Sequence, residues 1–534
     1  MSFEIRHKDL LGRIGLLHTK RGTVETPLLL PVVNPNAQVI TAKQLYETFG
    51  FSALITNAYL VWKRFREEQQ EIPKIHQLLD FDGIIETDSG AYQILRYGDV
   101  EVQPSEIIWF QEQLDTDIGV ILDVPTGEEV SRRRARWTVD ETLRRADEAL
   151  GVFTRKDILW VGPVQGGVHS DLVAYSAREM AKRDFAIHAL GSPTPVMQQY
   201  KFDVLVDMVM AAKLNLPPDR PLHLFGAGHP MMFAVAVALG CDVFDSASYA
   251  LFARNGRYMT AQGTAKIDEI EYFPCNCPSC HGKGPEEVRK LLPMDRERFL
   301  ASHNLHTCQS ELQTVKQAVV DGRLWELLET RSRNHPALHR AFQRVLHYAK
   351  NLERETPVRK RKGPFVTTVE SLSRPEILRH QDRLLERYEV PSRAKAVLLL
   401  PESYLKPFRE SLGKSRSLAK IEQRSDLHIC SYGLAFAVVP YELLDVYPLS
   451  QTEDALSSTA TTVRHASKRI ESYLKAATYK SCIIVVDEPW QSRIAKTLRS
   501  KFRGRTKVTI LDARDLDTEL HNHILKTLTR KNRH

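Results

Sequence analysis

The chain has 534 residues, which is too many for one hydrophobic core and predicts a large domain followed by smaller ones. Its contents of hydrophobic (43%) and charged (26%) residues are those of an ordinary globular protein, and no apolar run approaches the roughly 18–20 residues of a membrane span. The first residues also lack the apolar core of a signal peptide, so we expect a cytoplasmic protein without membrane contact.

The positive charge of the chain is unevenly distributed. The net charge is +8, which favours a polyanionic partner. Positive residues form three clusters, at 132–136, 359–362 and 530–533. One such cluster is usually a solvated surface or a linker, but three on a basic chain favour a nucleic acid as partner.

Short apolar strands alternate with amphipathic helices over about the first 250 residues. The expected strands are Pro27–Val33, Ala53–Thr56, Gly83–Thr87, Ile118–Asp123, Leu159–Gln165, Ala186–Leu190, Leu222–Gly226 and Asp242–Asp245. The expected helices are Thr41–Phe49, Pro104–Asp115, Val139–Phe153, Leu172–Lys182, Phe202–Asn215 and Pro230–Leu239. Eight such units predict a (β/α)8 TIM barrel. A doubly wound sheet is the alternative, which the lack of a Gly-x-Gly-x-x-Gly motif and of a phosphate-binding loop disfavours.

Polar residues stand where several of these strands end. Asp88, Asp123 and Asp245 follow strands three, four and eight. Other candidates at or near strand ends are Ser89, Tyr92, Gln165, Gly166, Gly191 and Phe225. A single Asp there could cap a turn, but in a barrel all of these residues would meet at the C-terminal mouth, where barrel enzymes place their chemistry. Aromatic rings, carboxylates, an amide and glycine N–H groups together predict a pocket for a flat heterocycle.

Two of these carboxylates also suit glycosidic chemistry. In a retaining glycosidase one carboxylate attacks the anomeric carbon, and the other serves first as acid and then as base, with about 5–5.5 Å between them. Asp88 and Asp245 are the candidates for such a pair.

Three of the seven cysteines stand close together after the last barrel strand. Cys275, Cys277 and Cys280, with His303 further along the chain, match a closed tetrahedral zinc site of structural type. His281, His306 and Cys308 compete for the role of fourth ligand. We expect one structural Zn²⁺ in a subdomain at about 265–325, inserted in a barrel domain of residues 1–355.

A basic linker is expected at 356–364, where a helical stretch gives way to Thr-Pro and Gly-Pro. Two small α/β domains are expected beyond it, at 365–430 and 431–534. Their strands would be Val397–Leu400, Ile429–Ser431, Ala435–Val439, Cys482–Val486 and Val508–Leu511, and their helices Pro375–Tyr388, Thr461–Ala477, Pro489–Lys501 and Asp517–Thr529. No set of catalytic residues converges there, so a binding or structural role fits this part.

Taken together, these motifs resemble those of the tRNA-guanine transglycosylases of the archaeal type. The matching segments are Thr87–Gln93, Val164–Gly167, Gly226–Pro230, Phe244–Tyr249 and the cysteine–histidine set, with Val446–Ser450 in the C-terminal part. The resemblance covers residues 1 to about 350 specifically and the remainder more loosely. It implies exchange of guanine at position 15 in the D-loop of tRNA for 7-cyano-7-deazaguanine (preQ0), in archaeosine biosynthesis.

The resemblance also implies residue roles. Asp245 would be the nucleophile that forms a covalent ribosyl-enzyme, and Asp88 the general acid/base. Asp123, Gln165, Gly166 and Gly191 would bind the edge of the base, Tyr92 and Phe225 would sandwich its ring, and Ser89 would lie nearby.

Partners follow from the same resemblance: tRNA, the free base and a second copy of the chain in a homodimer. Members of the archaeal type commonly end in an RNA-binding PUA domain, which is not recognised here. We therefore expect a separate PUA-containing protein, or binding of tRNA by the remaining modules. The alternatives are an archaeosine-synthase-like paralogue and a non-catalytic tRNA-binding subunit of a transglycosylase complex.

Overall fold

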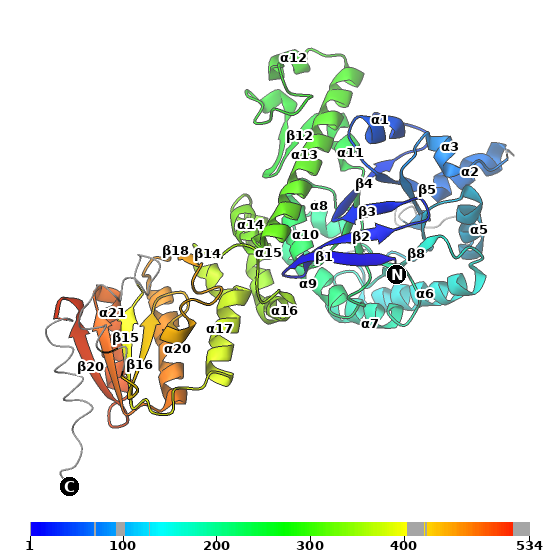
Figure 1. Ribbon diagram of the computed structural model, residues 1–534. Helices are drawn as coiled ribbons and strands as arrows, with labels where there is room; N and C mark the ends of the chain where they lie inside the picture. The colour runs from blue at the N-terminus through cyan, green and yellow to red at the C-terminus, as the bar shows by residue number, and fades with distance from the viewer. Residues whose placement is uncertain are drawn as a thin grey trace, which may run out of the picture. The chain divides into compact units, whose positions relative to one another are not determined.

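The computed structural model describes residues 2–68, 71–91, 102–127, 129–402, 421 and 424–515 (Figure 1). The chain divides into two compact units, Met1–Tyr348 with Glu355–Pro357, and Ala349–Arg354 with Val358–His534. None of the helices among the described residues has the length and apolar character needed to span a membrane.

The first unit is built on a closed barrel of eight parallel strands, as predicted. These are β4 (Leu28–Val33), β5 (Ala53–Asn57), β6 (Ile84–Asp88), β7 (Ile118–Val120), β8 (Leu159–Val164), β9 (Ile187–Leu190), β10 (Leu222–Leu224) and β11 (Val243–Ser246). Closure occurs where β11 pairs with β4, with Asp245 opposite Leu30, so the alternative of an open sheet is excluded. Every second side chain along these strands faces the interior of the barrel and fills it, as Ile55, Ile84 and Ile118 do.

Helices follow the strands and surround the barrel (Figure 1). They are α1 (Ala42–Glu47), α2 (Ala58–Glu68), α3 (Ile75–Leu79), α5 (Pro104–Leu114), α6 (Arg132–Val152), α7 (Ser170–Met180), α8 (Thr194–Gln198), α9 (Phe202–Lys213), α10 (Pro230–Ala238) and α11 (Ser248–Arg254). All nine residues of α10 are buried, because α13 (Pro293–Asp321) and α14 (Leu324–Ser332) pack over it. That burial explains why this helix is apolar around its whole circumference.

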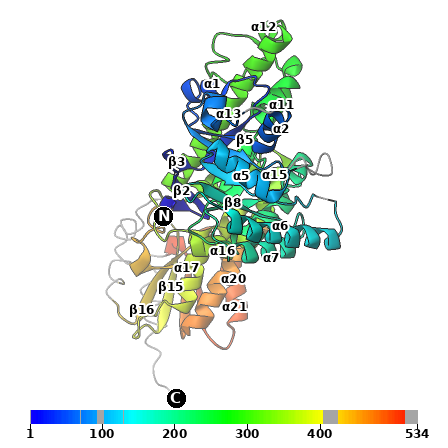
Figure 2. The ribbon, with the colours of Figure 1, turned by 90° about the vertical axis from the view of Figure 1, so that its right-hand side faces the viewer.

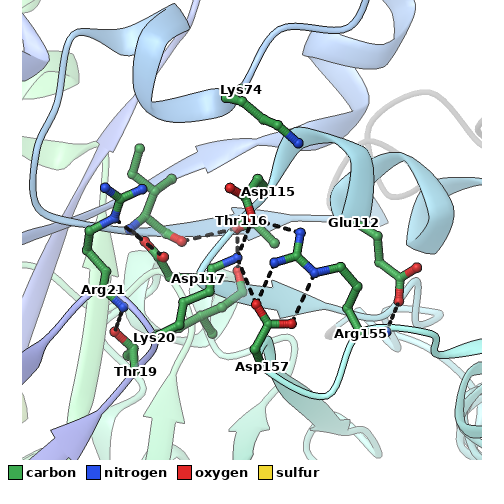
Figure 3. A network of polar contacts seen from close by, with 12 residues as sticks. Thr19, Lys20, Arg21, Lys74, Glu112, Asp115, Thr116, Asp117, Arg155 and Asp157 are labelled. Carbon is green, nitrogen blue, oxygen red and sulfur yellow. Dashed lines mark hydrogen bonds and ion pairs between the residues drawn. The ribbon is translucent and has the colours of Figure 1, made fainter.

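An N-terminal antiparallel sheet, which we did not expect from the sequence, closes one end of the barrel. It comprises β1 (Phe3–Asp9), β2 (Gly12–His18) and β3 (Thr23–Thr26), and its apolar side chains join the interior core. Figure 3 shows the β2–β3 turn, where Lys20 meets Asp115 (2.7 Å) and Arg21 approaches Asp117 (3.9 Å), next to the starts of β7 and β8. Arg155 also binds Asp115, at 2.7 Å. The sheet covers the N-terminal ends of the strands, and their C-terminal ends form the opposite mouth.

A small subdomain follows β11. It contains β12 (Arg257–Thr260), β13 (Gly263–Lys266) and α12 (Pro285–Arg289), and it leads into the long helix α13. The first unit then continues through α14 and α15 (Pro336–Val345). Figure 1 shows α12 and the β12–β13 hairpin beside α13.

The second unit carries a five-stranded sheet of order β17-β16-β15-β19-β20, in which β17 alone is antiparallel to its neighbour. The strands are β15 (Ala396–Pro401), β16 (Leu427–Tyr432), β17 (Val438–Pro440), β19 (Ser481–Val486) and β20 (Lys507–Asp512). Side chains of α17 (Pro375–Glu386), α20 (Ala460–Ala477) and α21 (Pro489–Lys501) join the core on one face (Figure 2).

Two expectations for this part differ from the structure. The expected domain boundary at 430/431 falls inside β16, and segments on both sides of it pair in one sheet because β16 lies between β15 and β17. In the expected basic linker, Lys360 is buried, and its Nζ lies 2.6 Å from Glu376. The expected helix Asp517–Thr529 and the basic cluster at 530–533 lie outside the described residues.

Candidate active site and metal centre

A cavity of about 610 Å³ opens at the C-terminal ends of the barrel strands. Its lining includes six polar or aromatic residues and one glycine, one from each of seven strand ends or the loops that follow: Asn57, Asp88, Asp123, Gln165, Gly191, Phe225 and Asp245. Six of these seven are residues that the sequence singled out, and Asn57 is the addition. The alternation of side chains along a strand explains the convergence, since Asp88 is two and four residues beyond the inward-facing Glu86 and Ile84.

Asp88 is held by its neighbour on β5 and is surrounded by negative charge. Asn57 Nδ2 donates to Asp88 Oδ2 at 2.9 Å. Burial, and then the charges of Asp123 and Asp245, raise the pKa of Asp88 to about 7. A carboxyl group with such a pKa can both donate and accept a proton near neutral pH, which is what an acid/base catalyst must do.

Asp245 is anchored through one of its two oxygens. Oδ1 accepts hydrogen bonds from the Gly226 N–H at 2.8 Å and from His223 Nε2 at 3.0 Å. Gly226 has a φ of 68°, a conformation that favours glycine. No donor from the described residues bonds Oδ2, so this oxygen is available to form a bond to a substrate in the cavity.

His223 and Glu86 form a buried pair directly beneath Asp245, which the sequence analysis did not find. His223 Nδ1 lies 3.2 Å from Glu86 Oε1, and both side chains are almost completely buried. Burial alone would lower the pKa of His223, but the Glu86 charge and the hydrogen bond to Asp245 raise it to about 10. The sequence does hold one sign of this pair. An ionisable residue interrupts each of two short apolar runs, Ile84-Ile85-Glu86 and Leu222-His223-Leu224.

The opposite side of the cavity carries an amide bound to a carboxylate. Gln165 Nε2 donates to Asp123 Oδ2, and Gln165 Oε1 accepts from Thr126 N at 3.0 Å and from Ser192 Oγ at 3.1 Å. Burial raises the pKa of Asp123 to about 6, although the bond from Gln165 opposes the rise. A Cβ at Gly191 would collide with the Gln165 amide, so this position requires glycine as long as Gln165 keeps its place.

Two other candidate residues lie outside the cavity lining, and a third is not among the described residues. Ser89 is buried away from the cavity lining, and its hydroxyl donates to the Ile121 carbonyl at 3.0 Å. The Gly166 N–H donates to Thr126 Oγ1 at 3.0 Å, which fixes the turn behind Gln165. Tyr92 lies outside the described residues. The rim of the cavity adds residues that the sequence did not indicate, among them Tyr200 and Phe252.

The cysteine–histidine set gathers as a group that could hold a metal ion. The donor atoms of Cys275, Cys277, Cys280 and His303 all lie within 4.8 Å of one another. His303 Nδ1 is 3.6 Å from Cys277 Sγ and 3.4 Å from Cys280 Sγ. Tetrahedral Zn²⁺ with ordinary bond lengths would place such a pair about 3.6 Å apart, so the spacing fits.

The surroundings of His303 decide between the candidates for the fourth ligand. His303 Nε2 lies 2.8 Å from the Met259 carbonyl, so it carries the proton and leaves the Nδ1 lone pair facing the thiolates. Tyr258 stacks on the ring at 3.5 Å. The competitors are engaged elsewhere: His281 with Asn276, His306 with Phe49, and Cys308 with the Gly228 carbonyl.

The sequence was compared with known protein families and proteins. The profile of the queuine tRNA-ribosyltransferase family matches residues 9–337, and that of a domain of unknown function, DUF5591, matches residues 377–528. Proteins named tRNA-guanine(15) transglycosylase are similar along much of the chain. The one from Thermococcus kodakarensis is 47% identical over 383 residues, which are 71% of this chain and 65% of the relative.

Two further relatives of the same name come from other archaeal genera. The Methanocaldococcus jannaschii protein is 42% identical over 85% of this chain and 68% of its own length. The Sulfolobus acidocaldarius protein is 38% identical over 90% of this chain and 95% of its own length.

Proposed function

The chain belongs to the queuine tRNA-ribosyltransferase family, and from this membership we propose that it is a tRNA-guanine transglycosylase. The observation that carries the proposal is the convergence of Asp88, Asp123 and Asp245 on one cavity at the barrel mouth. The names of its relatives point to guanine 15 of tRNA as the target. The incoming base in this proposal is preQ0. The exchange of guanine for preQ0 is then a step of archaeosine biosynthesis.

The exchange proceeds in two half-reactions through a covalent intermediate. Asp245 Oδ2 bonds to C1′ of the ribose as the C1′–N9 bond breaks, and the departing guanine takes a proton from Asp88. The incoming base then gives its N9 proton to Asp88, and its N9 bonds to C1′ as the ester to Asp245 breaks. Two displacements at one carbon retain the configuration.

Recognition of the base falls to the other side of the cavity. Asp123 accepts hydrogen bonds from the base, while Gln165 and the backbone at Gly191 complete the contacts along its edge. Phe225 covers one face of the ring, and Tyr92 is proposed for the other. The guanine must leave its stack to enter this cavity, as for other enzymes that act on nucleobases.

The four metal-site residues are proposed to bind one Zn²⁺. Three thiolates and one imidazole would complete its tetrahedral shell, so the ion has no position open for water or substrate. When bound, it supplies structural cross-linking rather than catalysis. It ties the loop before α12 to α13, which carries His303.

The second unit offers a surface for the RNA backbone. A groove of about 570 Å³ between α20 and α21 is lined by five cations, Arg464, Lys468, Lys475, Arg493 and Lys501. Its one carboxylate, Glu471, binds Lys475 at 2.7 Å and Lys501 at 2.5 Å. The other three cations have no carboxylate partner among the described residues and are free to contact phosphates.

The first two clusters that the sequence indicated are less suited to this role, and the third lies outside the described residues. On α6, Arg132 pairs with Asp171 and Arg136 with Asp140, which neutralises part of the first cluster. Lys360 of the second cluster is buried against Glu376.

Substitution of the nucleophile tests the proposal. Asp245→Asn is expected to lose measurable incorporation of labelled guanine into tRNA and of preQ0 at position 15, while its metal content stays at the wild-type level. Asp268→Asn, at an exposed position, is the matched control and should retain exchange. Undiminished exchange by Asp245→Asn would refute the assignment.

The same products distinguish the alternatives. Mass spectrometry of the reacted tRNA should show preQ0 itself at position 15. A later modification of an inserted base would indicate an archaeosine-synthase-like paralogue, and binding of tRNA without any exchange would indicate a non-catalytic subunit.

A further inference from the structure

The buried pair His223–Glu86 has no part in the two half-reactions described above. His223 lies on β10 and Glu86 on β6, in the barrel interior directly below Asp245 and Asp88. Neither carboxylate oxygen of Glu86 has a hydrogen-bond partner of good geometry, although Oε1 lies 3.2 Å from His223 Nδ1. A pair of apolar residues of similar volume would fill this layer without the cost of removing two charges from water.

The protonation state of the ring follows from its two contacts. Nδ1 faces Glu86, and Nε2 faces Asp245 at 3.0 Å. A neutral imidazole has one N–H and one lone pair, so it would turn the lone pair toward one of the carboxylates. The doubly protonated ring presents an N–H to both, and it neutralises charge in a buried layer of the barrel.

We propose that His223, kept as an imidazolium by Glu86, is a positioning residue for Asp245, which it keeps ionised and which it stabilises as the leaving carboxylate of the ribosyl ester. This inference rests on the proposed function, because it needs Asp245 as the nucleophile. Glu86 acts one step further away, through the ring of His223.

The charge of Asp245 changes in each half-reaction, and His223 bears on both changes. In the first step the C1′–Oδ2 bond forms, the C1′–N9 electron pair leaves with guanine, and Asp245 becomes a neutral ester. In the second step the C1′–Oδ2 pair returns to Asp245 as the incoming N9 bonds to C1′. The negative charge then reappears on a group 3.0 Å from the imidazolium, which favours this departure.

Other charged groups make the imidazolium more important. The carboxyls that face this region are Glu86 and Asp88 on β6, Asp123 after β7 and Asp245 on β11. Arg145 of α6, which pairs with Glu141, acts on Asp123. Without the charge of His223, Asp245 would lose the cation beside it while the like charges of Asp88 and Glu86 remain nearby, which disfavours its ionised form. The acid limb of the exchange rate should report this change.

The test compares His223→Gln and Glu86→Gln with the wild-type protein. His223→Gln keeps an N–H donor but cannot carry charge, and Glu86→Gln removes the counter-charge while leaving the ring in place. In the plot of guanine-exchange rate against pH, the fall on the acidic side should shift to higher pH by about one to three units in each variant. A neighbouring charge produces shifts of this size. A second readout uses the denaturant-stable protein–RNA adduct that forms with tRNA in the absence of free base. When preQ0 is then added, each variant should release the RNA on the order of tenfold more slowly than the wild-type protein.

His188→Gln is the matched control. His188 is equally buried on the adjacent strand β9, but it does not contact either carboxylate, so its variant should keep the wild-type profile. An unchanged acid limb in His223→Gln, or an equal shift in His188→Gln, would overturn the inference. If His223→Gln does not fold, Glu86→Gln provides the same readout.

The unaltered protein provides an independent readout. In ¹⁵N-histidine NMR, one doubly protonated imidazole should persist at pH 8.5, and its absence would also overturn the inference. Failure of the proposed function is distinguishable, because in that case the wild-type protein itself would show no guanine exchange or no adduct at Asp245.

Discussion

Asp88 shows how one residue acquires a role that its own position in the sequence does not reveal. Read alone, an Asp before Ser-Gly is as well suited to capping a turn as to catalysis. In the structure it lies half-buried at the cavity, near Asp123 and Asp245, with its pKa raised to about 7. Burial and like charges, not the local sequence, give it the pKa that the proposed acid/base role needs.

That pKa shift predicts how stability depends on pH. Asp88 binds its proton more tightly in the folded protein than in the unfolded chain, where its pKa is 3.8, so folding stability falls as pH rises from about 4 to 7. Asp88→Asn removes this loss and should be more stable than wild type at pH 8 by between about 1 and 4 kcal/mol. Urea unfolding at pH 4 and pH 8 measures the difference.

The same variant should be impaired in exchange by about 10²–10⁴-fold, because the departing and incoming bases lose their proton donor and acceptor. Asp80→Asn, at an exposed Asp that pairs with Lys43, is the control for both assays. A variant at Asp88 with lower stability at pH 8 and normal exchange would contradict the account.

Gly191 is a second residue whose importance depends on a contact. Its missing side chain leaves room for the Gln165 amide, which binds Asp123. Gly191→Ala should displace Gln165 and raise the KM for the free base by about tenfold or more, while kcat at saturating base falls less. Gly151→Ala is the control, since a Cβ there meets nothing within 4 Å, and an equal effect in both variants would contradict the role of Gly191.

The residues that sequence reasoning missed have a common physical reason. Asp88, Asp123 and Asp245 stand at strand ends, where an alternating pattern places them at one mouth. His223 and Glu86 lie inside strands, and only the closure of the barrel brings β10 and β6 to opposite sides of one interior layer. Asn57 was missed similarly, because its contact with Asp88 depends on the pairing of β5 with β6.

At the scale of elements, the candidate metal centre would join a loop to a helix. Cys275, Cys277 and Cys280 precede α12, whereas His303 projects from α13. The sequence could predict the three thiolates from their spacing, but not which of four candidates completes the set. The carbonyl of Met259 decides it, because it orients the His303 ring.

Removal of the fourth ligand tests this element. His303→Ala should lower the zinc content well below one per chain and lower the melting temperature of the first unit, because metal binding contributes to folding. His281→Ala should retain the metal, since His281 is exposed and bonds to Asn276. Elemental analysis together with thermal unfolding measures both quantities. Loss of zinc from His281→Ala alone would contradict the ligand assignment.

Expectations about elements succeeded most fully in the barrel. All eight strands were predicted, because buried parallel strands are short apolar runs separated by amphipathic helices. The N-terminal sheet was not, since β1 exposes most of its residues to solvent and its sequence Phe-Glu-Ile-Arg-His-Lys-Asp is largely charged. In the second unit, the five strands of the larger sheet were predicted but their assembly into one sheet was not, because the order of pairing is not a local property. The short paired strands Phe365–Val366 and Glu453–Asp454 were not predicted.

At the scale of the whole molecule, the two units would divide the work on tRNA. In the proposed function, the cavity at the barrel mouth would hold the reacting nucleotide, and the basic groove between α20 and α21 would hold phosphates elsewhere on the RNA. Phosphate contacts fix the position of the RNA without reading its sequence. The groove should therefore affect affinity for tRNA and not the chemistry.

Charge reversal in the groove tests this division. The double variant Arg464→Glu, Lys468→Glu should raise the Kd for tRNA by at least tenfold and reduce the dependence of binding on salt, because fewer counterions are released. Its kcat at saturating tRNA should stay near that of wild type. Lys182→Glu, at an exposed residue just beyond α7, is the control. Unchanged binding by the double variant would show that tRNA does not use this groove.

The central claim is that Asp245 forms a covalent bond to the ribose of tRNA. The most direct measurement is to mix the protein with tRNA in the absence of a free base, denature it, digest both polymers and map the modified peptide by mass spectrometry. We predict a ribosyl adduct on the peptide that contains Asp245, and its disappearance when preQ0 is added before denaturation. An adduct on Asp88, or ongoing exchange without any adduct, would contradict the account.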